Sequence, residues 1–353
     1  MISNAILKPI SDTNSTLLTN TTCSQCLCYS NLAYSAVNCF TNNSCQLISQ
    51  YPLTYSIVLT LGARLYFPRQ IFPDSSQGCM PNINILLSKL TSGNRATVNI
   101  SNPSELLLDS LGYISTIDQS RGALRRFNIT NLAPVDSLSV DTSSQMAIGY
   151  DNGMYYSKAY SGQMFMINST TLTIVNTMAS APFNRARSMI FINNSQTMIV
   201  TSYGSNCLLF FNQVNTTPTN YTYVSSQTVN YSGPYGIWKV NDSFFYVTSY
   251  DNNSIYSYSR TSVSWREAFV FQVSNVSVTS GVTHLTIDKD NRIWISSRMQ
   301  KTLVYDQQGS LLGSYTIPNA QIFDIKILDN YVMFFSDPGA DRIIRIDPNI
   351  QCY

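Results

Sequence analysis

The sequence carries little charge for its size. Charged residues make up 11% of its 353 residues, against about 25% in a typical soluble domain. Lys and Arg together number 21 and Asp and Glu together 19, which leaves a net charge of +2. Nucleic-acid binding needs a basic stripe, and acidic disordered chains carry a large net charge. The composition therefore argues against both classes, and we expect no nucleic-acid partner.

Long apolar runs and a secretory leader are also missing. The longest apolar candidate, residues 55–67, is interrupted by Thr60, Gly62 and Arg64, so the sequence predicts no transmembrane helix. Residues 1–16 have neither a basic nor an apolar leader region. Either the natural chain begins further upstream, or export is non-standard, or a secretory interpretation is wrong, and we favour the first.

Histidine is nearly absent. His284 is the one histidine in the chain, which excludes zinc sites built on several histidines and mechanisms that use two. His284 has two interpretations. It is either a general base oriented by Asp288 or Asp324, or a satisfied residue at the start of an inner strand, and we favour the second.

Cysteine is concentrated near the N-terminus. The sequence has eight Cys, and five of them crowd together: Cys23, Cys26, Cys28, Cys39 and Cys45. A zinc knuckle needs a second matched pair of ligands, so a disulfide-stapled module is the favoured reading, because so short a segment has little core. The spacing does not choose among the many possible pairings.

The other cysteines are scattered. Cys79 and Cys352 flank the repeat region described next, and we expect them to form a clasp between its ends. Cys207 begins a β-run, where a buried or disulfide-bonded residue is favoured over a nucleophile.

Glycosylation motifs agree with a secretory setting. The N-x-[ST] pattern occurs 13 times, and glycans would supply the solubility that charge does not. With the cysteine cluster, these motifs predict a secreted or extracellular glycoprotein.

From residue 104 onward one unit recurs: a β-run, a polar turn, a second β-run, another turn and a third β-run. The second runs start at Tyr113, Met154, Met198, Phe245, Ile293 and Val332. They are rich in aromatic and β-branched residues, as strands prefer. A period of 40–50 residues with several strands per copy is typical of a propeller. The sequence therefore predicts an all-β fold, a six-bladed β-propeller.

The ends of the repeat array indicate how it closes. The sixth copy ends without room for a fourth strand, while an unassigned β-run occupies residues 96–100. We expect this N-terminal strand to close the last blade by pairing with residues 342–346. The predicted organisation is a disordered segment over 1–19, a cysteine-rich module over 20–72, a linker with a short helix (residues 82–90) over 73–95, and the propeller over 96–353.

Two resemblances accompany this organisation. The motifs Gly236-Ile-Trp, Phe245-Tyr-Val-Thr and Asn291-Arg-Ile-Trp-Ile resemble NHL-type six-bladed repeats, which implies the fold and little about function. The run from Cys23 to Cys45 is similar to PAN/apple-like modules of secreted proteins. That resemblance implies binding to protein or carbohydrate.

Strand alternation divides the turns between two faces. Turns after first and third strands lie on one face, the bottom, and the remaining turns lie on the top. The glycosylation motifs assigned to the bottom are Asn128, Asn168, Asn193, Asn215 and Asn241. We expect glycans to shield that face and leave the top face free.

The top turns are rich in Tyr and Arg, the residues that recognition surfaces favour. The predicted ligand-binding residues are Arg121, Arg185, Arg187, Tyr203, Tyr235, Tyr250 and Arg298, with Lys158 and Tyr160 in the same class of turn. The competing interpretation is that a chain with 23 Tyr places some in every loop.

Catalytic motifs are scarce. No G-x-S-x-G elbow or P-loop is present. Lactonase-like propellers hold a central calcium, and Glu105 and Asp324 are the acidic residues at the starts of inner strands. We predict a binding protein that needs no cofactor, acts as a monomer, and recognises a protein or glycan. A calcium-dependent hydrolase and an intracellular NHL-type scaffold are the alternatives.

Overall fold

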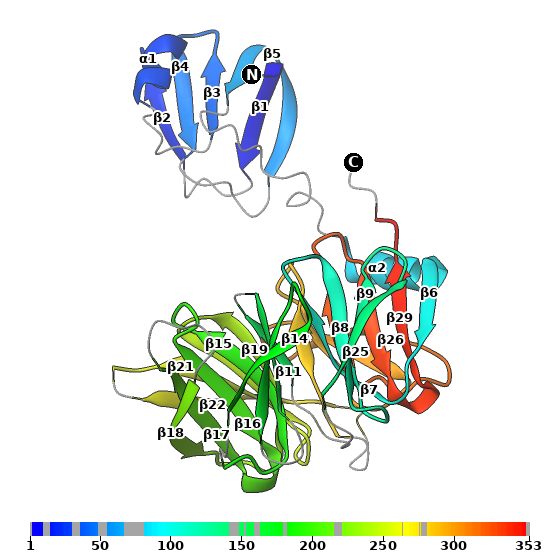
Figure 1. Ribbon diagram of the computed structural model, residues 1–353. Coiled ribbons are helices and arrows are strands. Elements are labelled where there is room, and N and C mark those ends of the chain that lie inside the picture. Colours follow the sequence, from blue (N-terminus) through cyan, green and yellow to red (C-terminus); the bar gives the residue numbers. More distant parts are fainter. Residues whose placement is uncertain are drawn as a thin grey trace. The chain divides into compact units, whose positions relative to one another are not determined.

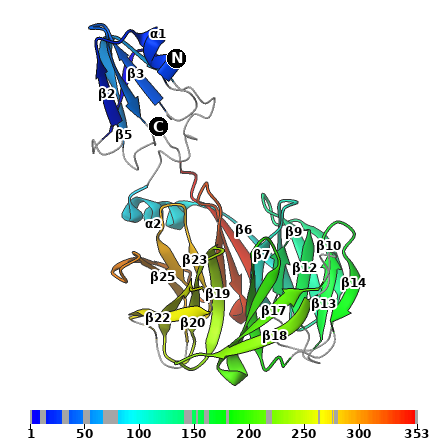
Figure 2. The same ribbon diagram turned by 90° about the vertical axis from the view of Figure 1, so that its left-hand side faces the viewer.

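The chain forms two compact units, one within Met1–Met80 and one over Pro81–Ile350. A computed structural model describes residues 2–9, 15–29, 36–48, 55–66, 81–140, 148–151, 153–158, 163–178, 182–214, 221–262, 264–274, 276 and 281–350. Figures 1 and 2 show the two units from directions 90° apart. No helix in these ranges is long and apolar enough to cross a bilayer.

Unit 1 is built on one antiparallel sheet of five strands in the order β1-β5-β3-β4-β2. The strands are β1 (Ile2–Pro9), β2 (Ser15–Thr19), β3 (Ala36–Phe40), β4 (Ser44–Ile48) and β5 (Tyr55–Tyr66). The hairpin β3–β4 lies inside the sheet, and its residues Val37 and Cys45 are fully buried.

A short helix, α1 (Cys23–Tyr29), contacts this hairpin. The side chain of Gln25 accepts a hydrogen bond from the Thr22 backbone N–H at 2.9 Å, and Thr22 Oγ1 accepts one from the Gln25 N–H at 3.4 Å. This reciprocal pair is a capping box, which satisfies helix donors that would otherwise be free.

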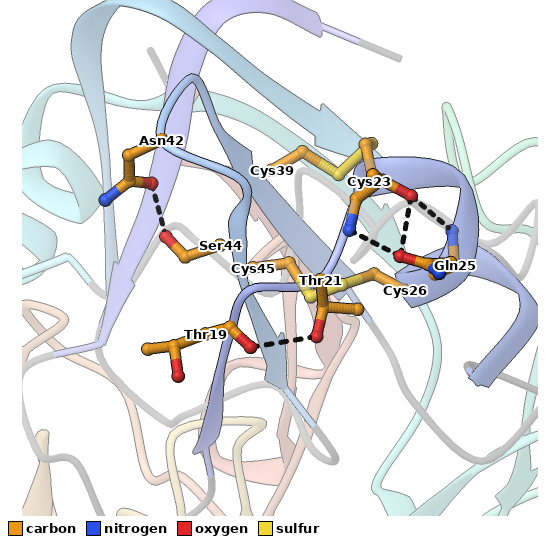
Figure 3. The surroundings of a disulfide bond; sticks show 10 residues. Thr19, Thr21, Cys23, Gln25, Cys26, Cys39, Asn42, Ser44 and Cys45 are labelled. Carbon is orange, nitrogen blue, oxygen red and sulfur yellow. Dashed lines mark hydrogen bonds between the residues drawn. A yellow bond between two sulfur atoms is a disulfide. The ribbon is translucent and has the colours of Figure 1, made fainter.

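Two disulfides fix α1 to the hairpin: Cys23–Cys39 and Cys26–Cys45 (Figure 3). The disulfide interpretation of this cluster is thus confirmed for the four cysteines whose side chains are described. The side chain of Cys28 is not described, and the predicted Cys79–Cys352 clasp lies outside the described residues. In unit 2, Cys207 is a buried free thiol, and burial raises its pKa.

The prediction of a disordered segment over residues 1–19 is wrong. Strand β1 pairs with β5 from Ile2↔Leu65 to Pro9↔Tyr55, and β2 pairs with β4. Leu18 of β2 packs against the buried cysteine cluster. The polar residues around this leucine concealed an edge strand, because such a strand needs few apolar side chains when its backbone groups are paired.

Unit 2 consists of six four-stranded antiparallel sheets across the described residues. Sheet 1 has β7 (Pro103–Leu108), β8 (Tyr113–Asp118), β9 (Ala123–Asn128) and β10 (Pro134–Ser139). Sheet 2 has β11 (Ile148–Asp151), β12 (Met154–Lys158), β13 (Met164–Asn168) and β14 (Thr173–Met178). Sheet 3 has β15 (Ala186–Ile192), β16 (Thr197–Ser202), β17 (Cys207–Gln213) and β18 (Tyr221–Thr228), with the 3-10 turn η2 (Tyr203–Ser205) between β16 and β17.

The remaining sheets continue the repeat. Sheet 4 has β19 (Pro234–Asn241), β20 (Phe244–Ser249), β21 (Ser254–Arg260) and β22 (Trp265–Gln272). Sheet 5 has β23 (Leu285–Ile287), β24 (Ile293–Ile295), β25 (Lys301–Tyr305) and β26 (Leu311–Thr316). Sheet 6 has β27 (Asp324–Ile327), β28 (Met333–Asp337), β29 (Arg342–Asp347) and β6 (Asn94–Asn99), with the 3-10 turn η3 (Pro338–Ala340) between β28 and β29.

Sheet 6 joins the two ends of the repeat array. Strand β6 pairs with β29 from Arg342↔Asn99 to Asp347↔Asn94, and the two strands lie side by side in Figure 1. The expected pairing of residues 96–100 with 342–346 is therefore present, displaced by one residue.

The first strands of the six sheets contact one another in the order β7, β11, β15, β19, β23 and β27, and β27 returns to β7. The apolar core follows the same order, because each of its main clusters joins two successive sheets. Phe127 of sheet 1 packs with Phe334 of sheet 6, for example, and Ile117 of sheet 1 packs with Tyr155 of sheet 2.

The predicted helix over residues 82–90 is observed as α2 (Ile83–Ser92), with Asn82 accepting a hydrogen bond from the Asn84 N–H at the N-cap. Its placement in a linker over 73–95 is wrong. Leu86 and Leu90 are fully buried in the core between sheets 5 and 6. The helix therefore belongs to unit 2, since its apolar face is covered by β26.

Candidate functional site

A cavity of about 430 Å³ lies where the inner strands of five sheets begin or end. Its lining residues are Asn102, Gln119, Arg185, Arg187, Tyr203, Tyr235, Tyr250, Arg298 and Phe323. Six of the seven predicted ligand-binding residues are among these nine. They belong to sheets 3, 4 and 5, so the fold gathers residues that are up to 113 positions apart in the chain.

The exception is Arg121. Its side chain is exposed and its Nε lies 3.9 Å from Asp118 Oδ2, and it does not line the cavity. The side chain of Lys158 is not described, and Tyr160 lies outside the described residues.

Hydroxyl groups of second strands hold the inner strands that carry the cavity residues. Thr201 Oγ1 donates to the carbonyl of Tyr235 at 2.5 Å, and Ser296 Oγ donates to the carbonyl of Phe323 at 2.8 Å. In both cases donor and acceptor belong to successive sheets. These bonds fix the start of each inner strand, and thereby the position of the ring that it carries into the cavity.

Three tyrosine rings form the aromatic part of the cavity. Tyr235 is buried, and the ring of Tyr250 stacks on it with centroids 5.2 Å apart. Tyr203 meets Tyr235 edge-on at 5.9 Å and Tyr250 edge-on at 6.0 Å. Gly281 has a φ of +42°, and a Cβ there would collide with the ring of Tyr250, so only glycine leaves room for this ring.

Two guanidinium groups lie over aromatic rings of the cavity. Arg187 Cζ is 4.9 Å from the ring centroid of Tyr235 and 5.2 Å from that of Tyr203. Arg298 Cζ is 5.4 Å from the ring centroid of Phe323, and its side chain hydrogen bonds to Tyr235. Such cation–π contacts hold the guanidinium plane in place.

Arg185 and Arg298 have left-handed backbones, with φ of +53° and +48°. The position of Arg185, directly before a first strand, is occupied in sheets 1 and 4 by Asn102 and Gly233, which also have positive φ. Asn and Gly adopt this conformation readily, whereas other side chains lose about 1–2 kcal/mol. Strained residues of this kind cluster at functional sites.

The cavity lining contains three arginines and no acidic residue. Among the described residues no carboxylate lies within ion-pair distance of Arg185, Arg187 or Arg298. The cavity therefore holds positive charge that the described chain does not neutralise.

The hydroxyls of Tyr203 and Tyr235 remain protonated. Burial raises the pKa of Tyr235, although Arg187 and Arg298 act in the opposite direction. Burial also raises the pKa of Tyr203, and the hydrogen bond from its hydroxyl to Asp251, at 3.0 Å, adds to this effect.

His284 lies directly beside the aromatic cluster. Its ring is 5.8 Å from the ring of Tyr235 and 5.0 Å from that of Phe323, measured between centroids. Its Nε2 faces Glu105 Oε2 at 3.8 Å, and Glu105 Oε1 accepts a hydrogen bond from Ser188 at 2.7 Å. The carboxylate that faces His284 is therefore that of Glu105.

The two carboxylates predicted to orient His284 have other partners. Asp288 Oδ2 accepts hydrogen bonds from Arg292 at 2.7 Å and from the Trp294 indole at 2.8 Å. Asp324 Oδ2 accepts one from the Leu106 N–H at 2.8 Å and lies 3.2 Å from Lys326 Nζ. Sequence spacing did not reveal Glu105, which is 179 residues from His284 in the chain.

Lys326 is also relevant to the alternative of a calcium-dependent hydrolase centred on Glu105 and Asp324. An ammonium group beside Asp324 already neutralises one of the two carboxylates that would have to bind the metal. Within the described ranges no group of three or more His, Cys, Asp or Glu side chains is placed to hold a metal ion.

Sequence reasoning missed Asn102, Gln119 and Phe323. Gln119 follows the second strand of sheet 1 directly, as Tyr203 and Tyr250 follow those of sheets 3 and 4. Asn102 and Phe323 directly precede first strands, as Arg185 does. Aligning the repeats by strand ends, instead of searching the turns for Tyr and Arg, would have found all three.

Four of the five glycosylation motifs assigned to the bottom face are described, and they lie at the strand ends opposite to the cavity. Asn128 and Asn168 end third strands, Asn241 ends a first strand and Asn193 follows one. First and third strands run in the same direction because neighbours are antiparallel. Asn215 lies outside the described residues.

Comparison with known proteins identifies the fold of unit 2. No family model matches the chain, and no curated protein matches it. Solved structures do. The β-propeller domain of Cps50 (Swd1) from Myceliophteria thermophila aligns with a TM-score of 0.55 and 7% identity over 72% of this chain and 99% of that one.

Two further structures agree. A luciferin-regenerating enzyme aligns with a TM-score of 0.56 and 10% identity over 72% of this chain and 95% of that one. The WD40 β-propeller domain of Doa1 aligns with a TM-score of 0.53 and 10% identity over 69% and 78%. Unit 2 has a WD40-like β-propeller fold. At these identities the likeness concerns the fold alone, and the predicted propeller is confirmed at that level.

Proposed function

We propose that this chain is a non-catalytic binding protein that recognises a protein or glycan ligand at the cavity of unit 2. The observation that carries the proposal is the convergence of six Tyr and Arg residues from three sheets on one cavity. Recognition sites favour these residue types, because their side chains combine apolar area with hydrogen-bond donors. Propeller domains that act in protein assemblies support a protein partner by analogy of fold.

We further propose that the six sheets are the blades of one closed propeller. Two observations support closure: the first strands contact one another in a cycle, and β6 from the start of unit 2 completes the sheet of β29. Closure would protect sheet edges. The NHL subtype is part of this proposal and rests on the repeat motifs.

Unit 1 is proposed to be a PAN/apple-like module that adds a second recognition surface. A helix held to a central hairpin by two disulfides, within a five-stranded sheet, supports this assignment. The module would bind on its own, since it is a separate compact unit.

An extracellular setting is proposed from the same chemistry. Disulfides persist in oxidising compartments, and the described part of the chain has two. In the motifs at Asn128, Asn168 and Asn241, the side-chain oxygen accepts a hydrogen bond from the backbone of the motif's own Ser or Thr at 2.8 Å. These turns would present the amide nitrogen for glycosylation. We propose that the protein acts as a secreted monomer.

The proposal is tested with chain secreted from eukaryotic cells. Wild-type protein and the variant Arg185→Asn are compared on a glycan array and on a displayed-peptide library, with Arg266→Gln, which changes an exposed residue on β22, as the control. Binders that are retained by Arg266→Gln and lost with Arg185→Asn support the proposal. If all binders are equally retained by Arg185→Asn, the cavity is not the binding site.

A further inference from the structure

We infer that the ligand enters the cavity with an oxyanion, a carboxylate, sulfate or phosphate group, which the guanidinium groups of Arg185, Arg187 and Arg298 hold. The inference rests on the proposed function, because it names the chemical group that the same cavity takes.

Three other arginines of the chain pair with carboxylates. Arg292 lies 2.7 Å from Asp288, Arg342 lies 2.8 Å from Asp337, and Arg345 lies 3.1 Å from Asp347. Wherever these guanidinium groups leave bulk water, a carboxylate neutralises them, as physical chemistry requires.

Arg187 departs from this pattern, because it is half-buried and has no described carboxylate partner, whereas Arg185 and Arg298 are exposed to solvent. Two carboxylates hydrogen bond to other lining residues and not to the guanidinium groups: Asp251 accepts from the Tyr203 hydroxyl at 3.0 Å, and Asp341 accepts from the Asn102 N–H at 2.7 Å. Three cations therefore surround one space without a described carboxylate. An anion that arrives from outside would supply the missing charge.

Arg187 also has a buried N–H donor without a partner among the described residues. The Arg187 guanidinium lies over the rings of Tyr203 and Tyr235, with Cζ 5.2 and 4.9 Å from their centroids. Its Nε is buried and has no hydrogen-bond partner within the described part of the chain. Buried donors of this kind are rarely left unused. Guanidinium groups pair with oxyanions through two parallel N–H···O bonds, and the Arg187 Nε–H is a donor of the kind that such a pair uses.

Arg187 and Arg298 are preorganised by the aromatic rings that they lie over. Stacking on aromatic rings fixes Arg187 and Arg298, so these side chains lose little conformational freedom when an anion binds. Arg185 keeps an unfavourable left-handed backbone where the equivalent residues are Asn102 and Gly233. Retaining an arginine at that cost is explained if its charge contacts the ligand.

Neutral donors complete the site. The Asn102 amide donates to Gln119 Oε1 at 3.3 Å, which fixes both amides beside the guanidinium groups. With the Tyr235 hydroxyl they offer hydrogen bonds to groups next to the anion. A carboxylate or sulfate on a larger polar molecule would use both sets of donors.

The experiment is isothermal titration calorimetry of the full chain at constant ionic strength set by chloride. The probes are the tri-glutamate peptide, glucuronate and inorganic sulfate, and tri-glutamine and glucose are their neutral counterparts. We expect saturable binding of at least one anionic probe, with Kd near or below about 1 mM, and none of its neutral counterpart. The probe that binds identifies the source of the anion: peptide, acidic sugar or free ion.

Variants assign the binding to the cavity. Arg187→Gln should weaken it about tenfold or more, since a hydrogen bond to a charged group is lost, and Arg266→Gln should not change it. Arg185→Asn serves as a second variant, because Asn accepts the left-handed backbone and the fold is retained. The inference is overturned if none of the three anions binds saturably. It is also overturned if both cavity variants bind the anion with the affinity of the wild-type protein.

The outcomes separate this inference from the proposed function. If a ligand from the array needs Tyr250 but is insensitive to Arg187→Gln, the cavity binds a ligand and the oxyanion inference fails. If an anion binds at Arg187 while no glycan or peptide is retained, the oxyanion site stands and the proposed recognition function fails.

Discussion

Arg187 and Tyr235 stack on each other, with the guanidinium carbon 4.9 Å from the ring centroid. The two residues belong to the neighbouring first strands β15 and β19. The contact therefore joins two sheets at the same place where it fixes a cation in the cavity. A residue with this double role links the stability of the propeller to the geometry of its candidate site.

The left-handed backbone at Arg185 leads to an unusual expectation. Arg185→Asn should leave the free energy of unfolding unchanged or raise it by up to about 1 kcal/mol, because Asn relieves backbone strain. The same substitution should remove binding. Thermal or denaturant unfolding of the purified variant measures the first part. A loss of more than about 1 kcal/mol would show that the arginine is retained for stability.

A pair of carboxylates predicts opposite effects of pH. Burial raises the pKa of Asp151 above 3.8, although Ser195 and Lys239 oppose it. The folded state then binds the proton more tightly than the unfolded chain, so the stability that this group contributes falls as pH rises through its folded pKa. Asp151→Asn should therefore stabilise the protein at neutral pH, and the gain should vanish below about pH 3.

Asp242 is the matched control for this experiment. A hydrogen bond from Lys239, at 2.7 Å, lowers its pKa below 3.8. Its contribution is present above the unfolded pKa and is lost as pH falls through the folded value. Asp242→Asn should thus destabilise slightly at neutral pH. Urea unfolding at several pH values measures both variants, and effects of the same sign would contradict the assignment.

Pairing of β6 with β29 can be tested by proline. Ala96 lies opposite Arg345 and Thr97 opposite Ile344, and N–H groups of adjacent residues in an edge strand point in opposite directions. One of Ala96→Pro and Thr97→Pro should therefore break a ladder hydrogen bond and cost about 1–3 kcal/mol. The other should be tolerated better and serves as its control. Unchanged unfolding of both variants would mean that the strand does not close the sheet.

How far the sequence predicts this structure depends on the kind of signal. Alternating aromatic and β-branched runs, such as those that start at Phe245 and Ile293, predicted the repeats because strand periodicity is local. The same repeat logic led to the β6–β29 pairing. The edge strand β1 was missed, since an edge strand pairs through its backbone and needs few apolar residues to mark it.

The candidate site was predicted by residue type and corrected by geometry. Tyr and Arg in top turns identified most of the cavity, but Arg121 is drawn towards Asp118 instead. The contact between His284 and Glu105 could not be predicted from the sequence. It forms because the first strand of sheet 1 and the start of the first strand of sheet 5 lie close together. Contacts across the centre of a propeller have no sequence spacing that reveals them.

The disulfide pattern predicts a specific peptide map. Non-reducing digestion should yield Cys23 linked to Cys39 and Cys26 linked to Cys45. Replacing Cys26 and Cys45 by Ala should lower the stability of unit 1 by about 2–4 kcal/mol. Unit 2 should be unaffected, because it forms a separate compact unit. Cys26 linked to Cys39 in the native protein would contradict the fold of unit 1.

The most direct test of the binding cavity is an anomalous difference map from crystals of the full chain soaked in sodium selenate, a sulfate analogue. The account predicts a selenium peak in the cavity of the wild-type protein, with the selenate oxygens within hydrogen-bond distance of the Arg187 guanidinium, and no such peak in crystals of Arg187→Gln. A cavity without selenium in wild-type crystals that carry selenate elsewhere, or the same peak in Arg187→Gln, would contradict it.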